Sequence, residues 1–308
     1  MKRRVVYLVF AVVLFASAVS FAQDVQSGHG GPEPPMAGIQ WAKDHVPDQH
    51  ARTGGASSSP NLIYHGGPIM NTAAVTAIFW GQGWNNATFM GDKVTGLDSF
   101  YGGVGGSNYA LTNSEYNNTS GLSVSGAVTY NGHIFDFSSA PANGSRTSPI
   151  LAEVCKIIPN PVSNGFYPVY VDTRRGHAGF CAWHSAGSCN GTPVQFAFFF
   201  NLDGDPGCDP GDTSGLHSQG LAALANVSGH ELSEALTDPR LNAWYDSGGA
   251  ENSDKCAWAF GPTSIPFSST STRWKIQGNW SNSAYNTTTR GYTNLSGQKG
   301  CIDGGTYN

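Results

Sequence analysis

The sequence is poor in charged residues, and this limits the partners that it can have. Only 12% of its 308 residues are Asp, Glu, Lys or Arg, and 21 acidic residues face 16 basic ones. Three of the basic residues lie in the first four positions, so a chain starting after residue 22 would carry a net charge near −8. Because nucleic-acid binding depends on clustered positive charge, we expect no nucleic-acid partner.

Several familiar enzyme motifs are also missing. No serine stands in a Gly-x-Ser-x-Gly elbow, and no Walker-type phosphate loop is present. The cysteines form no Cys-x-x-Cys pair, which argues against a structural zinc ribbon. The enzyme classes built on these motifs are therefore not favoured.

A long apolar run occurs only at the start of the chain. Residues 5–19 are almost unbroken in their apolar character, and basic residues precede them. Ser20 and Ala22 supply the small residues of a cleavage site. The run is shorter than the roughly 20 residues that a membrane-spanning helix needs. We therefore predict a signal peptide over residues 1–22, a secreted, extracellular protein, and no membrane association after cleavage.

The six cysteines fit export, because an even number in a secreted chain favours three disulfides and leaves no thiol nucleophile. They stand at positions 155, 181, 189, 208, 256 and 301, and spacing alone leaves 15 pairings open. Cys181 and Cys189 are close enough in sequence to close a short loop around Trp183 and His184. Cys256 could anchor the segment before it.

Composition divides the rest of the chain into two parts. Residues 23–60 are rich in Gly, Pro, Ser and His without apolar periodicity, which predicts a flexible linker or a propeptide remnant. Residues 61–308 form a predicted single globular domain. Its expected strands are 73–80, 167–171, 194–200 and 273–277, and its expected helices are 92–102, 147–158 and 214–237.

The helix expected over residues 214–237 has two different faces. At 100° per residue, apolar side chains such as Leu221 and Leu232 gather on one side, which we expect to face the core. His230, Glu234 and Asp238 gather on the other. The helix therefore presents potential ligands opposite its core face.

The sequence His230-Glu231-Leu232-Ser233-Glu234 varies the His-Glu-x-x-His motif of zinc peptidases. In that motif two imidazoles one turn apart bind the metal, and the Glu handles a water proton. Glu234 replaces the second imidazole here, and a carboxylate also reaches zinc at about 2.0–2.2 Å. We predict His230 and Glu234 as metal ligands and Glu231 as general base.

The third ligand must come from elsewhere in the chain. Glu251 and Asp254 follow the helix at short range, and a downstream Glu is a common third zinc ligand. We predict Glu251 as ligand, with Asp254 and Asp238 orienting the ligands. The alternative is a solvated helix face with a capping carboxylate network.

Two further features have a functional and an ordinary interpretation. The acidic segment 201–212 alternates Asp with Gly and could bind calcium, although an acidic loop between a strand and the long helix is the preferred interpretation. His184 could assist a neighbouring site as acid or ligand, but a hydrogen-bonded loop histidine is the ordinary interpretation. The same holds for His65.

Three segments carry a resemblance. They are Tyr-His-Gly-Gly-Pro at 64–68 before an expected strand ending in Trp80, Phe-Cys-Ala-Trp-His at 180–184, and the stretch 222–239. Together they resemble the phosphate-induced (EXORDIUM-like) protein family of plant cell walls, over most of residues 61–303. The resemblance implies an exported, cell-surface protein linked to growth signalling. Plant members have no His-Glu-x-x-Glu at this point, so the resemblance does not support catalysis. It is equally consistent with bacterial relatives that keep a metallopeptidase site lost in the plant branch.

Together these observations predict an α+β domain, in which a mixed β-sheet packs on the 214–237 helix in a zincin-like, disulfide-stapled arrangement. The leading hypothesis is a secreted zinc peptidase acting on extracellular protein, peptide or cell-wall material. The alternative is a non-catalytic EXORDIUM-like binding or signalling protein with a structural carboxylate or metal cluster. Carbohydrate binding is a third hypothesis, motivated by eight tryptophans.

Overall fold

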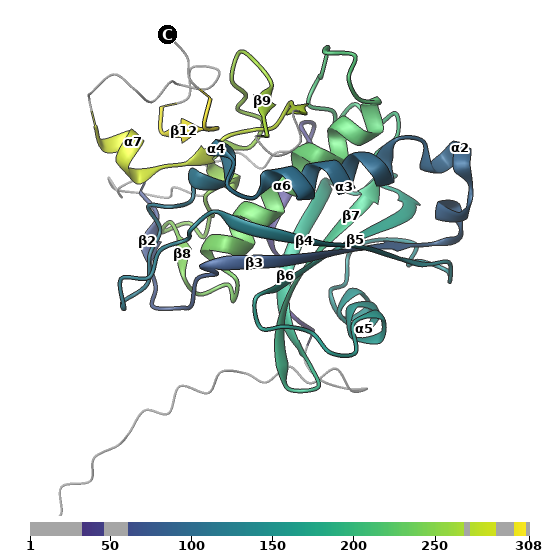
Figure 1. The fold of residues 1–308 in the computed structure, drawn as a ribbon, viewed down its shortest axis with the longest axis horizontal. Coiled ribbons are helices and arrows are strands. Elements are labelled where there is room, and N and C mark those ends of the chain that lie inside the picture. Colours follow the sequence, from purple (N-terminus) through teal and green to yellow (C-terminus); the bar gives the residue numbers. More distant parts are fainter. Residues whose placement is uncertain (1–32, 46–60, 268–271, 288–298, 306–308) are drawn as a thin grey trace, which may run out of the picture.

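A six-stranded mixed β-sheet lies at the centre of the protein (Figure 1). Its strand order is β1-β6-β7-β5-β3-β4. The strands are β1 (Ala37–Trp41), β3 (Thr72–Trp80), β4 (Ala127–Asp136), β5 (Gly165–Arg174), β6 (Phe180–Cys189) and β7 (Thr192–Asn201). Strands β4, β3, β5 and β7 run parallel, β6 runs antiparallel to β7, and β1 runs antiparallel to β6. The predicted mixed sheet is confirmed.

The structure is a computed structural model that describes residues 33–45, 61–267, 272–287 and 299–305. The predicted signal peptide lies outside these residues. Within them, no helix combines the length and the apolar character needed to cross a membrane.

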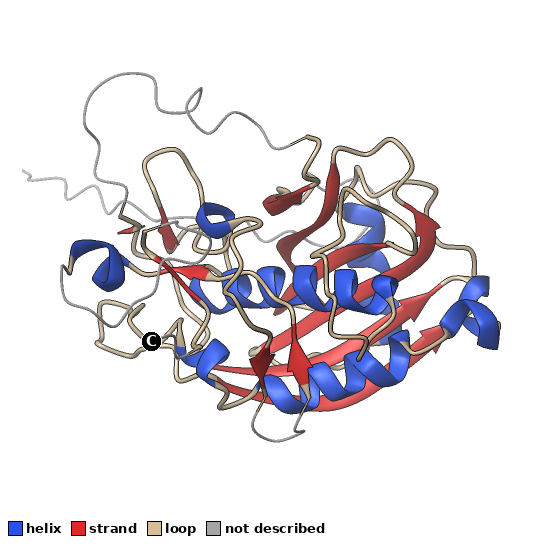
Figure 2. Ribbon diagram, turned by 90° about the horizontal axis from the view of Figure 1, so that it is seen from above, coloured by secondary structure: helices blue, strands red, loops and turns tan. Residues whose placement is uncertain are grey.

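Helices cover both faces of the sheet. Helix α3 (Lys93–Val104) and helix α6 (Gln219–Thr237) lie side by side on one face, as Figures 1 and 2 both show, and α5 (Ser148–Ile157) packs on the other. The remaining elements are short: η1 (Gln82–Asn85), α2 (Ala87–Met90), α4 (Asn108–Leu111), η2 (Asp254–Cys256), α7 (Asn282–Asn286), β2 (Ile63–Tyr64), β8 (Trp244–Tyr245), β9 (Ile265–Pro266), β10 (Arg273–Trp274), β11 (Asn279–Trp280) and β12 (Cys301–Ile302).

The strands predicted from apolar runs are present because both faces of the sheet are covered. Parallel strands buried on both sides need continuous apolar sequence, and β5 and β7 have it. The predictions at 73–80, 167–171 and 194–200 are confirmed as β3, β5 and β7, and the helices at 92–102 and 147–158 as α3 and α5. The strand expected at 273–277 is reduced to the two residues of β10.

The predicted disulfide loop between Cys181 and Cys189 is wrong. The segment is strand β6, which turns into β7 through Asn190 and Gly191, both at positive φ (53° and 80°). Eight residues of strand span about 26 Å, so these two cysteines cannot meet. The disulfides join Cys155 to Cys189, Cys181 to Cys208 and Cys256 to Cys301. The expected number of three is confirmed.

The flexible linker predicted over residues 23–60 does not hold for Ala37–Trp41. This segment is β1, an outer strand paired with β6, and Ala42 after it is fully buried. Its composition hid the strand because Gly38 and Gln40 interrupt the apolar alternation. The rest of the predicted linker, except residues 33–45, lies outside the described residues.

Helix α6 begins five residues later than predicted and is buried on all sides. Ser218 caps it by accepting a hydrogen bond from the Leu221 N–H, and all residues from Gly220 to Thr237 are buried. The alternative of a solvated helix face is therefore excluded. A helix that is polar on one side yet fully enclosed must satisfy those polar groups internally.

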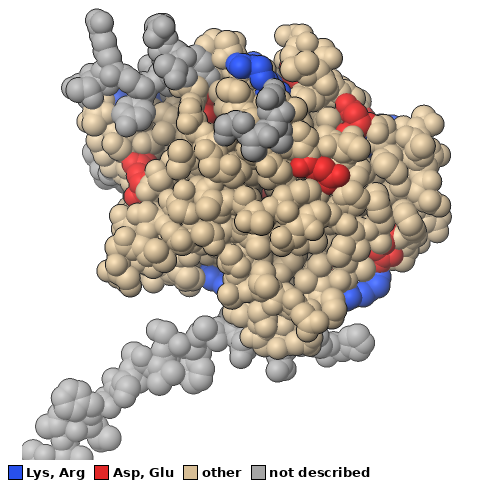
Figure 3. Space-filling model, viewed as in Figure 1, with Lys and Arg blue, Asp and Glu red and all other residues tan. Residues whose placement is uncertain are grey.

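The face of the molecule in Figure 3 carries few charged side chains. This agrees with the low charged fraction of the sequence. The acidic residues of α6 contribute nothing to the surface, because Glu231 and Glu234 are 0% exposed.

Candidate metal centre

Side chains from three parts of the fold converge beside α6. Among the described residues, two groups could each hold a metal ion: His184, Glu231 and Glu234 form one, and His230, Glu234 and Asp254 form the other. In each group one ligand atom per residue lies within 4.8 Å of the others. Glu234 belongs to both groups and is the centre of the arrangement.

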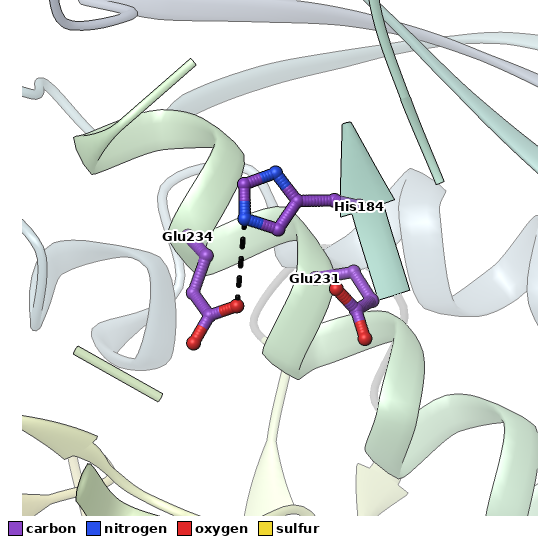
Figure 4. Close-up of side chains that lie close together, drawn as sticks. All are labelled: His184, Glu231 and Glu234. Carbon is purple, nitrogen blue, oxygen red and sulfur yellow. Dashed lines mark ion pairs between the residues drawn. The ribbon is translucent and has the colours of Figure 1, made fainter. Parts of the chain in front are cut away.

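The two carboxylate oxygens of Glu234 face different imidazoles. Its Oε2 lies 3.6 Å from His184 Nε2, and its Oε1 lies 3.1 Å from His230 Nε2. The backbone N–H of Asp254 donates to Oε1 at 2.9 Å. Figure 4 shows the His184 ring projecting from β6 toward α6, with the Glu234 carboxylate below it. Ligand atoms of one tetrahedral ion at about 2.1 Å lie about 3.4 Å apart, so these spacings suit shared coordination.

The downstream carboxylates take different places from those predicted. Glu251 lies 3.0 Å from His184 Nε2, not beside His230. Asp254 instead faces His230, with Oδ1 3.7 Å from Nε2. Asp238 accepts hydrogen bonds from the backbone N–H groups of Asn242 and Ala243. Its role in orienting the metal ligands stays a prediction.

His184 is the residue that sequence reasoning undervalued. It is 1% exposed and lies on β6, whose neighbour β7 is a core strand. Its sequence neighbourhood has no ligand pattern, because its partners come from a helix about 50 residues further on. His65 does not join the site: its ring stacks on Tyr245 with centroids 3.6 Å apart.

The carboxyl groups are buried without a protein cation to balance them. None of Glu231, Glu234 and Glu251 forms an ion pair with Lys or Arg in the part of the chain that the structure describes. Burial first, and then repulsion from neighbouring carboxylates, raises the pKa of each well above its ordinary value. Burial likewise raises the pKa of Asp238 to about 7 and lowers the pKa of His230 to about 4. A bound cation would remove this electrostatic conflict.

Buried polar atoms without hydrogen-bond partners mark where such a cation would act. They are His230 Nε2, both oxygens of Glu231, Glu234 Oε2 and Glu251 Oε1. Each unsatisfied buried polar atom costs about 1–3 kcal/mol. Five such atoms around one helix turn fit a missing ligand better than a finished hydrogen-bond network.

Gly38 of β1 packs tightly against the first group. A Cβ at this position would lie 1.9 Å from Glu234 Oε2, 2.2 Å from His184 Cδ2 and 2.5 Å from His184 Nε2, so no larger side chain fits there. Since Gly38 also has φ +50°, both its conformation and its close approach to the two side chains depend on glycine.

The tautomer of His230 favours the first group over the second. The Gln277 amide is fixed because its oxygen accepts from the Trp258 N–H at 3.2 Å and its nitrogen donates to the Ser253 carbonyl at 3.0 Å. The same nitrogen donates to His230 Nδ1 at 2.9 Å. A neutral ring that accepts at Nδ1 carries its proton on Nε2, the nitrogen facing Glu234. Metal binding there would require a rearrangement of Gln277.

The acidic loop 201–212 does not support the calcium prediction. Lys93 pairs with Asp203, and Arg175 Nε lies 2.6 Å from Asp205 Oδ2. Neither metal-ligand group found among the described residues includes a residue of this loop. Protein cations have taken the place that calcium would occupy.

No protein-family model, curated protein or solved structure matches the chain. The resemblance to the phosphate-induced family stays a prediction.

Proposed function

We propose that this protein is a secreted metal-dependent hydrolase whose ion is held by His184, Glu231 and Glu234. The observation that carries the proposal is the convergence of these three buried side chains, whose ligand atoms lie within 4.8 Å of one another. Both oxygens of Glu231 and Glu234 Oε2 also have no hydrogen-bond partner. One imidazole with carboxylates suits zinc, and also manganese or ferrous iron. The three disulfides support the extracellular setting.

A divalent ion in this position supplies Lewis acidity and, if it is zinc, lowers the pKa of a coordinated water to about 7. Glu251 is the adjacent proton acceptor, because its Oε1 has no partner while its Oε2 faces His184. Hydrolysis of an extracellular peptide, protein or cell-wall polymer is the reaction class that these groups serve.

This assignment exchanges the roles predicted for Glu231 and Glu251. Glu231 converges with His184 and Glu234, whereas Glu251 belongs to neither ligand group. Metal analysis of Glu231→Gln and Glu251→Gln tests the exchange. We expect Glu231→Gln to lose most of the metal, and Glu251→Gln to keep it while casein hydrolysis falls at least 100-fold. The opposite pattern would restore Glu231 as base.

A second pair of variants tests the imidazole. We expect His184→Asn to lose the ion and His230→Asn to retain it, as measured by elemental mass spectrometry of the purified protein. Loss of the ion in His230→Asn alone would show that the ion is held by His230, Glu234 and Asp254 instead. A wild-type protein that binds no zinc, manganese or iron at micromolar concentration would overturn the proposal.

A structural metal centre in a non-catalytic, EXORDIUM-like protein is the second candidate, and the burial of the site favours it. His184, Glu231, Glu234 and Glu251 are each at most 3% exposed, so no substrate reaches them in this conformation. Bound metal without hydrolysis of any polymer would favour this candidate. Carbohydrate binding has no comparable support, because none of the eight tryptophans is exposed.

A further inference from the structure

The N-terminal described segment, residues 33–45, covers the candidate metal centre. We call this segment the strap. Its strand β1 runs along the outer edge of β6, with Ala37 opposite His184. Gly38 comes next in the strap and lies against both His184 and Glu234.

The strap is held by polar contacts as well as by apolar burial, since Ala42 belongs to the core and Met36 and Ile39 pack against it. Glu33 accepts hydrogen bonds from the Ser148 N–H at 2.9 Å and the Ser148 hydroxyl at 2.6 Å. Further along, the Trp41 carbonyl accepts from the Trp258 indole at 2.9 Å. Within β1 the pairing is irregular, with register shifts on both sides of Gln40. An irregular outer strand is less firmly bound than the core strands.

Gln40 makes the strap costly to keep in place. Its side chain is 0% exposed, and neither its amide nitrogen nor its amide oxygen has a partner. Two unsatisfied atoms oppose docking by about 1–3 kcal/mol each. A strand belonging permanently to the core would be expected to carry an apolar side chain there.

No covalent bond except the chain itself joins the strap to the domain. All six cysteines lie at position 155 or beyond and pair with one another. A single cut between the strap and Asn61 would therefore leave it held only by non-covalent contacts.

We propose that the strap is a removable inhibitory strand, whose release opens the metal centre and frees the edge of β6. The inference rests on the proposed function, since it supplies the access that a hydrolase needs. In the intact chain the strap fills the space that substrate would enter. After release, the backbone groups of β6 at Phe180, Ala182 and His184 become available to another extended chain.

The test uses the secreted chain with a recognition site for a specific protease inserted within residues 46–60. The readouts are the rate at which a chelator removes the ion, hydrogen exchange of the β6 amides, and casein hydrolysis. We expect cutting and removal of the freed N-terminal fragment to speed ion removal and β6 amide exchange at least 10-fold. Adding back a synthetic peptide of residues 33–45 should reverse both changes.

The three readouts separate this inference from the proposed function. Faster ion removal and amide exchange without hydrolysis would support the removable strap and refute the proposed hydrolase activity. Unchanged amide exchange after release of the fragment would refute the strap, whatever the activity. An inserted but uncut site is the control for the insertion itself.

A point variant tests the same idea without a cut. A Cβ at position 38 would collide with Glu234 and His184, so Gly38→Ala should lift the strap and raise β6 amide exchange at least 10-fold. Gly121→Ala is the matched control, because Gly121 also has positive φ (75°) but has no atom within 4 Å of its Cβ position. Equal exchange rates in both variants would contradict the inference.

Discussion

Two acidic regions of this protein differ in which groups lie beside their carboxylates. In the loop 201–212, Asp203 and Asp205 are balanced by Lys93 and Arg175. Beside α6, Glu231, Glu234 and Glu251 are more deeply buried, yet pair only with histidines whose pKa values burial lowers. The first region has cations from the chain itself beside two of its aspartates, whereas the second has no Lys or Arg partner among the described residues.

The comparison shows why acidic residues alone are a poor guide to metal binding. The loop has the denser run of Asp and Gly, which is the stronger calcium pattern in sequence. Two of its four aspartates, Asp203 and Asp205, are nevertheless paired with basic residues about 110 and 30 positions away. Burial without a protein cation, not the number of carboxylates, distinguishes the candidate centre.

Removing the ion should give the largest difference between the two regions. A ligand present at 1,000 times its Kd stabilises the folded state by about 4 kcal/mol, so a chelator should lower Tm by roughly 10 °C. Differential scanning calorimetry with and without EDTA measures this. The shift should persist in Lys93→Met, because that residue serves the other region. A Tm that is insensitive to chelator in metal-loaded protein would remove the distinction.

The two disulfides nearest these regions should differ in how strongly their removal lowers metal affinity. Replacing either Cys256 and Cys301 or Cys181 and Cys208 with serine should cost about 2–4 kcal/mol in urea unfolding. Only the first pair follows the segment that carries Glu251 and Asp254. We therefore expect its loss to weaken metal affinity at least 10-fold. Equal affinity in the two double variants would show that this disulfide does not position the site.

Removing Lys93, which pairs with Asp203 of the loop, should have a smaller effect on the free energy of unfolding. Lys93 has a 4% exposed side chain, while Asp203 is 33% exposed, so solvent offsets part of the loss. We expect Lys93→Met to cost about 1–3 kcal/mol and Asp203→Asn in the same chain to recover part of it. Chemical denaturation of the two single variants and the double variant gives the coupling. Strictly additive changes would show that the pair contributes nothing.

The acidic pair Glu153 and Asp136 should give the smallest change in the free energy of unfolding, with a clear pH dependence. Burial, together with a hydrogen bond to Asp136, raises the pKa of Glu153 to about 7. Since the folded pKa exceeds the ordinary value of 4.5, the associated stability is present below pH 4.5 and is lost as pH rises through 7. Glu153→Gln should therefore stabilise the protein by about 1–2 kcal/mol at pH 8 and by little at pH 5. A pH-independent difference would contradict this account.

The elements predicted correctly are those that one local pattern determines. Strands β3, β5 and β7 follow from apolar runs, and α3 and α5 from helical periodicity. Strand β6 was missed because its stretch Ser185–Ser188 is weakly apolar, and β1 because Gly38 and Gln40 break its pattern. Both strands are specified by their neighbours in the sheet, which single-sequence patterns do not contain.

The same division applies to the site. The local spacing of His230, Glu231 and Glu234 identified the helix turn where carboxylates gather, because residues three and four apart share a helix face. Only the tertiary structure brought His184 from β6 to Glu234, turned Glu251 toward it, and tied His230 to Gln277. It also placed Gly38 over the centre. These contacts join residues from about 50 to nearly 200 positions apart, and no local propensity encodes such separations. They arise when the sheet and α6 pack around one core.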